Sequence, residues 1–149
     1  ASLLAAEPEG VAAELAHHCL ASNDLVGALA ASVRAAEEAA AVLAPAETLG
    51  HLTSALKLWE RVPDPASVAG SDHMELMLRA AEAANAAGDL ERAIAFAQDA
   101  AMTATADPAR GARAYERLGG YLIEADRMHD GLRARARAVE LVPAQPPTS

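Results

Sequence analysis

The sequence predicts an all-α protein of about seven helices arranged in antiparallel pairs. Apolar residues recur at helical spacing, helix caps and breakers punctuate the chain, and no segment keeps the alternating pattern of a strand. Of the 149 residues, 52% are hydrophobic but only 3% are aromatic, so alanine and leucine must supply most of the buried surface. Small alanine side chains let helices approach closely, which favours a stacked row of helices over a globule built around aromatic anchors.

The first half of the chain predicts three helices, over residues 9–22, 25–44 and 46–62. Asp24 is a good N-cap for the second helix, and Pro45 suits the first turn of the third. The third helix carries an apolar stripe at spacings of three and four residues, formed by Leu49, Leu52, Leu56 and Trp59. Residues 63–71 are rich in proline and glycine, so we expect a linker there.

The second half predicts four helices, over residues 73–87, 90–101, 109–125 and 131–142. Asp72, Asp89 and Asp107 stand at the N-cap positions of the first three, and the fourth follows Asp130. Asp72 with Glu75 predicts a capping box, and Gly88 predicts a left-handed residue that ends a helix. The proline-rich residues 144–149 predict a flexible tail.

An internal repeat emerges when Gly88 is aligned with Asp126, a shift of 38 residues. On the first helix of each pair, small and apolar residues then coincide: Met77, Ala80, Ala81 and Ala84 match Tyr115, Leu118, Gly119 and Leu122. On the second helix, Ala93 and Ala100 match Gly131 and Ala138, and Thr105 matches Pro143. An earlier and weaker unit contains Ala35, Ala36 and Ala39.

The pattern Tyr-x2-Leu-Gly-x2-Leu from Tyr115 to Leu122, followed by Ala138 and Pro143, resembles a tetratricopeptide repeat, a helix–turn–helix unit of 34 residues. This resemblance implies one domain over residues 1–149, built as a right-handed solenoid of stacked helix pairs. We expect the pairs at approximately 9–44, 29–62, 74–107 and 112–145, with a longer turn before residue 112 absorbing the extra length.

Longer strings resemble a particular family of proteins. Residues 12–64, 80–100 and 113–143 are similar, in order, to a segment of large actinobacterial LuxR-type transcriptional regulators with an N-terminal ATPase. The resemblance covers roughly residues 10–146, and its least generic parts are "ELAHHCL" and "ALKLWERVPD". In that family the helical repeats lie between a P-loop ATPase and a helix-turn-helix DNA-binding domain.

The resemblance implies a non-catalytic regulatory domain that senses an effector or a protein partner and relays its state to domains outside this chain. Because the chain opens without methionine inside a helical pattern, we expect a segment of a longer protein. Related ATPases fused to other output domains carry similar repeats, so the output domain stays open. The alternative is a structural scaffold or self-association module with no small-molecule effector.

Composition and charge exclude several other functions. The formal net charge of −9 repels phosphate backbones, and neither a P-loop motif nor a basic recognition helix is present. We therefore expect no direct binding of nucleic acid, no ATP hydrolysis and no cofactor. No apolar run is long enough to span a membrane and no signal peptide precedes the helices, which favours a cytoplasmic setting. The single Cys19 excludes a disulfide framework.

Candidate binding residues follow from the repeat geometry. In stacked helix pairs, polar residues on the first helices face a concave surface. One unit contributes Glu75, Glu82 and Asn85, and the next contributes Arg113, Glu116 and Glu124. We expect Glu75, Glu82 and Arg113 to face a polar ligand or a basic peptide, against the alternative that they are ordinary exposed residues kept for solubility.

Other reactive residue types have simpler explanations. Glu14-x-x-His17 has the spacing of a helical metal-ligand pair, but it lacks the second motif and the further glutamates that such a site needs. We expect no metal there, and we expect Cys19 to pack as a small hydrophobic residue. The basic run 133–137 fits a solvated last helix, and Trp59 either seals the end of a helix pair or anchors a partner.

Overall fold

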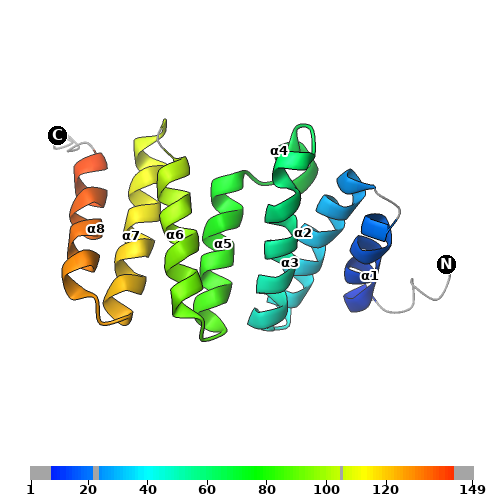
Figure 1. Cartoon of the computed structure of the whole chain (residues 1–149), viewed down its shortest axis with the longest axis horizontal. Coiled ribbons are helices and arrows are strands. Elements are labelled where there is room, and N and C mark those ends of the chain that lie inside the picture. The colour runs from blue at the N-terminus through cyan, green and yellow to red at the C-terminus, as the bar shows by residue number, and fades with distance from the viewer. Residues whose placement is uncertain (1–7, 22–23, 105, 143–149) are drawn as a thin grey trace, which may run out of the picture.

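The computed structural model describes residues 8–21, 24–104 and 106–142, and every regular element in these ranges is helical. The elements are α1 (Pro8–Ala21), α2 (Leu25–Ala41), α3 (Pro45–Leu58), the 3₁₀ turn η2 (Trp59–Arg61), α4 (Pro65–Ala69), α5 (His73–Ala86), α6 (Leu90–Thr103), α7 (Pro108–Glu124) and α8 (Met128–Leu141). Figure 1 shows the helices standing side by side in a row from α1 to α8. The predicted all-α helical-repeat solenoid is therefore confirmed.

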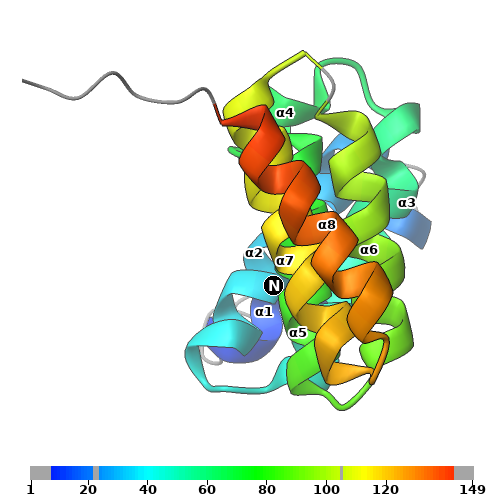
Figure 2. The ribbon, with the colours of Figure 1, turned by 90° about the vertical axis from the view of Figure 1, so that its left-hand side faces the viewer.

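Neighbouring helices in the row pack in antiparallel pairs. Helix α2 packs on α3, α5 on α6 and α7 on α8, while contacts of α3 with α5 and of α6 with α7 join one pair to the next. Helix α1 packs on α2 at one end of the row, and α8 closes the other end, where it lies in front of the array in Figure 2. The first helices of the three pairs are thus α2, α5 and α7.

The predicted linker over residues 63–71 is wrong in one respect, because it contains the short helix α4. Pro65 stands in the first turn of α4, and Gly70 ends it with a φ of 69°. A proline there needs no backbone hydrogen bond, so it starts a helix rather than preventing one. Helix α4 packs against α2 and brings the helix total in the described ranges to eight instead of about seven.

Aspartate caps start most of the helices as predicted. Backbone N–H groups donate to the carboxylates of Asp24, Asp72, Asp89 and Asp107. The capping box at Asp72 forms only one of its two bonds, because the Glu75 carboxylate binds Arg113 on α7 instead. Asp130 is not an N-cap: α8 begins three residues earlier than expected, with Arg127 at the cap and Asp130 in the first turn.

The turns between paired helices support the 38-residue alignment of the two units. Gly88 ends α5 with a φ of 83°, and Asp126 follows α7 with a φ of 61°. Both residues occupy the left-handed conformation that closes a helix. The aligned pairs of small residues on the four helices are buried, and Tyr115 alone is half-buried. Thr105 and Pro143, matched in the same alignment, lie outside the described residues, as does the predicted tail.

The core consists mainly of alanine and leucine. Leu29, Leu52 and Leu76 are completely buried, and the predicted stripe on α3 packs into the same cluster. Trp59 is 9% exposed and stacks on His73 with ring centroids 5.1 Å apart. This contact joins the end of α3 to the start of α5, so Trp59 seals the junction between two helix pairs.

Candidate functional site

The polar residues predicted to form a binding surface lie on α5 and α7, the first helices of two adjacent pairs. The structure brings Glu75 and Arg113 together: the guanidinium donates to both carboxylate oxygens, at 2.7 and 3.3 Å. Glu82 lies farther along α5, with its carboxylate 3.7 Å from a guanidinium nitrogen of Arg117. Within the described residues no hydrogen bond of the Asn85 side chain and no ion pair of Glu116 or Glu124 is formed, so the structure assembles only part of the predicted set.

A third ion pair completes this contact between α5 and α7. Arg110 donates to the carboxylate of Asp72, and together the three pairs form a ladder of Asp72–Arg110, Glu75–Arg113 and Glu82–Arg117. We call the surface that α2, α5 and α7 share the first-helix face. The ladder lies on its α5–α7 half.

Electrostatics within the ladder shift two ionisable groups. Burial raises the pKa of Asp72, but hydrogen bonds from the Glu75 backbone and the Arg110 side chain outweigh it and lower this pKa overall. The hydrogen bond with Glu75 raises the pKa of Arg113. Both shifts favour the charged forms of Asp72 and Arg113.

Sequence reasoning missed Arg110 and Arg117, and a signal for the first was present. Arg110 is the repeat equivalent of Asp72, and Arg113 is the repeat equivalent of Glu75, because both pairs are separated by the 38-residue shift. Residues at equivalent positions of stacked units lie on neighbouring turns of parallel helices. Opposite charges at equivalent positions therefore predict ion pairs between units.

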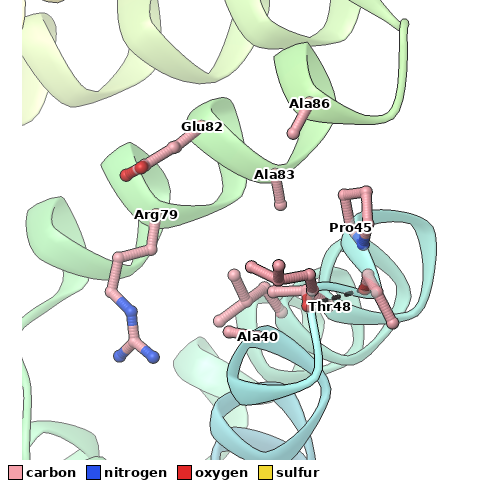
Figure 3. Close-up of a pocket in the computed structure, with 10 residues that line it drawn as sticks. Ala40, Pro45, Thr48, Arg79, Glu82, Ala83 and Ala86 are labelled. Carbon is pink, nitrogen blue, oxygen red and sulfur yellow. Dashed lines mark hydrogen bonds between the residues drawn. The ribbon is translucent and has the colours of Figure 1, made fainter.

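A pocket of about 360 Å³ lies on the other half of the first-helix face, between the α2–α3 corner and α5. Apolar groups line most of it, and its three polar lining residues are Thr48, Arg79 and Glu82. Figure 3 shows Ala83 and Ala86 of α5 facing Pro45 and Thr48, while the Glu82 carboxylate points away from them. Sequence reasoning identified Glu82 here but missed Arg79.

The residues with other potential chemistry lie apart from this face. Cys19 is 6% exposed and packs in the hydrophobic core, as predicted; burial and the nearby Asp24 carboxylate raise the pKa of its thiol. Glu14 and His17 are exposed on α1. Across residues 8–21, 24–104 and 106–142 no group of three or more His, Cys, Asp or Glu residues could hold a metal ion. Nor is any helix in those ranges long and apolar enough to cross a membrane.

Comparisons with known proteins are sparse. No protein-family model matches the chain, and no curated protein sequence matches it. Among solved structures, one described as "Crystal structure of MamA protein" shares 11% sequence identity with a TM-score of 0.42, covering 91% of this chain and 92% of that one. The fold assignment therefore stands on the helices described above.

Proposed function

We propose that this chain is a non-catalytic repeat domain that binds a protein partner, a peptide or a small effector on the first-helix face. The observation that carries the proposal is that one face of each first helix packs into the core while another face carries charged residues. Small and apolar residues of α5 and α7 pack inward, while charged residues of the two helices gather on one outward face beside a pocket. Surfaces of that kind on stacked helices serve as extended binding surfaces.

The ladder determines how a partner would bind. A ligand that approaches Glu75 or Arg113 must replace a bidentate ion pair, so it needs charges of both signs or must bind beside the ladder. Glu116 and Glu124, exposed on α7, offer carboxylates to a basic segment of a partner. The preferred partner is therefore a protein segment with basic residues.

Reversing the charges of Glu75 and Arg113 distinguishes an effect on binding from an effect on folding. Glu75→Arg and Arg113→Glu, made singly, break the ion pair, whereas the double swap rebuilds it with opposite polarity. Fluorescence anisotropy with labelled basic and acidic 12-residue peptides measures the binding. If the partner contacts this ion pair, the wild type should bind, and the affinity of the swapped protein should be at least tenfold lower. The swap should melt near the wild-type temperature, and Glu91→Arg on α6 serves as the charge-matched control for the single change Glu75→Arg.

Within this role, we propose that the chain belongs to a LuxR-type regulator with an ATPase and a DNA-binding domain outside it. The resemblance of residues 12–64, 80–100 and 113–143 supports this proposal. The coding sequence on the two sides of the segment tests it: a P-loop upstream and a helix-turn-helix downstream are expected. Flanking catalytic domains of another kind would overturn it.

A scaffold role is the second candidate, and one observation favours it. Val142, at the C-cap of α8, is half exposed. On α8 itself Met128, Leu132 and Val139 are at least half exposed, and their spacings of four and seven residues place them on a single stripe. We call it the α8 stripe. An apolar stripe of this kind suits contact with another protein surface, including a second copy of the chain.

A further inference from the structure

An arginine recurs at one position of the first helix in all three units. The segments are Arg34-Ala-Ala-Glu, Arg79-Ala-Ala-Glu and Arg117-Leu-Gly-Gly, and in each the two residues after the arginine are buried. Arg79 and Arg117 are related by the same 38-residue shift that aligns the two turns. In two of these units the arginine lies at the first-helix face, where Arg117 pairs with Glu82 and Arg79 lines the pocket.

In the last unit this arginine forms an ion pair with the first helix of the preceding unit. Arg117 on α7 reaches the Glu82 carboxylate on α5 at 3.7 Å. The equivalent pair one unit earlier is Arg79 on α5 with Glu37 on α2. Arg79 makes no ion pair with Glu37, or with any other residue of the described ranges.

Arg79 instead lines the pocket, and Glu37 is not among the lining residues. Arg79 is half-buried, and the pocket that it lines has a volume of about 360 Å³. Glu82, the one carboxylate that also lines it, is already paired with Arg117. Arg79 is therefore the charged lining residue that has no ion pair.

The rest of the lining is aliphatic. Its apolar members are Ala40, Leu43, Ala44, Pro45, Leu52, Ala83 and Ala86. Leu43 is 87% exposed and has a φ of 54°, a left-handed conformation that costs a leucine energy. An exposed, strained apolar residue at the edge of a pocket is typical of a surface that a ligand covers.

We propose that this pocket binds a small aliphatic carboxylate, with the carboxylate on Arg79 and the hydrocarbon chain against Leu43 and Ala83. A guanidinium suits a planar carboxylate because it offers two parallel N–H donors. At about 30 Å³ for each heavy atom, close to the volume of a water molecule in the liquid, the pocket holds a ligand of about a dozen heavy atoms. The inference rests on the proposed binding role, since it names the effector class of the same face.

Three six-carbon probes that differ in their charge test the site: hexanoate, hexanamide and hexylammonium. With ¹⁵N-labelled protein, we expect hexanoate to shift the amide resonances of Thr48, Arg79, Ala83 and Ala86 in a saturable way, with a dissociation constant of about 1 mM for so small a ligand. Hexanamide should bind at least tenfold more weakly, because it lacks the charge that Arg79 recognises. Stronger binding of hexylammonium, or hexanoate shifts confined to other helices, would overturn the proposal.

Two variants assign the binding to the residues named. Arg79→Gln should weaken hexanoate at least tenfold, whereas the matched Arg133→Gln on α8 should leave it unchanged. Leu43→Asn should also weaken hexanoate, and it should not harm the fold, because asparagine tolerates the left-handed conformation. Equal affinity in wild type and both pocket variants would reject the site. Binding of peptides at Glu75 and Arg113 is measured separately, so loss of the pocket leaves the proposed protein-binding role standing.

Discussion

Gly119 on α7 and Gly131 on α8 face each other so closely that neither position has room for a side chain. A Cβ atom at Gly119 would lie 2.9 Å from the Gly131 carbonyl oxygen, and a Cβ at Gly131 would lie 2.9 Å from the Gly119 carbonyl oxygen. These two backbones set the distance between the last two helices. At this point the two main chains are in contact, and the side chains of Arg135 and Ile123 pack over the two glycines.

Replacing Gly119 should destabilise the protein through overpacking. We expect Gly119→Leu to lower the free energy of unfolding by about 1–3 kcal/mol, since the new side chain must displace Arg135 and the α8 backbone. Gly120→Ala is the matched control: its Cβ would meet only the flexible Arg135 guanidinium at 3.8 Å, so helix propensity should stabilise it by about 0.5–1 kcal/mol. Urea titration followed by circular dichroism measures both, and equal effects of the two changes would disprove the close contact.

Gly88 and Asp126 should respond in opposite ways to substitution. Gly88→Ala forces an alanine into a φ of 83°, which should cost about 1 kcal/mol or more. Asp126→Gly relieves a left-handed aspartate at a φ of 61° and should stabilise the fold by up to about 1 kcal/mol. Thermal melting of the two variants beside wild type measures this, and the reverse order of melting temperatures would contradict the prediction.

The sequence predicted these turns because backbone conformation depends on a few local residues. Gly88 and the N-caps are local signals, and so is the apolar spacing that defines each helix. Local signals could not predict that Arg79 and Arg117 have different environments, because both stand in the same sequence pattern on the same kind of helix. Only the three-dimensional arrangement shows that Arg117 meets Glu82 whereas Arg79 borders a pocket. Helix α4 was missed for a related reason, since a five-residue helix leaves almost no periodicity to detect.

The Asp72–Arg110 pair should make stability depend on pH in the acidic range. The pKa of Asp72 is lowered in the folded protein, so its contribution is present above the ordinary value of 3.8 and is lost as the pH falls through the lowered value. Asp72→Asn retains a capping oxygen but loses the charge, and it should cost about 0.2–1 kcal/mol at pH 7 because both partners are partly exposed. Urea titrations at pH 7 and pH 2.5 should show this difference shrinking at the lower pH. A constant difference would mean that Asp72 contributes only as a cap.

Cys19 should react slowly while the protein is folded. Burial and the nearby Asp24 carboxylate raise the pKa of its thiol, which lowers the thiolate fraction at neutral pH. We expect labelling by a disulfide reagent such as dithionitrobenzoate to be at least a hundredfold slower in the native protein than in urea. Asp24→Asn keeps an N-cap acceptor but removes the charge, so native labelling should accelerate without loss of stability. Fast labelling of the native wild type would show that the thiol is accessible.

The α8 stripe should promote dimerisation at high protein concentration. Leu132 is 54% exposed and Val139 is 75% exposed, so contact between two copies would remove apolar surface from water. The net charge of −9 opposes that contact, and salt should therefore favour the dimer by screening the repulsion. Light scattering coupled to size exclusion should show the apparent mass rising with protein concentration, and rising further in 0.5 M NaCl. Leu132→Glu should abolish the increase, whereas Leu15→Glu on α1 should preserve it, because that residue lies at the opposite end of the row. A single monomeric mass at every concentration would show that the stripe does not mediate self-association.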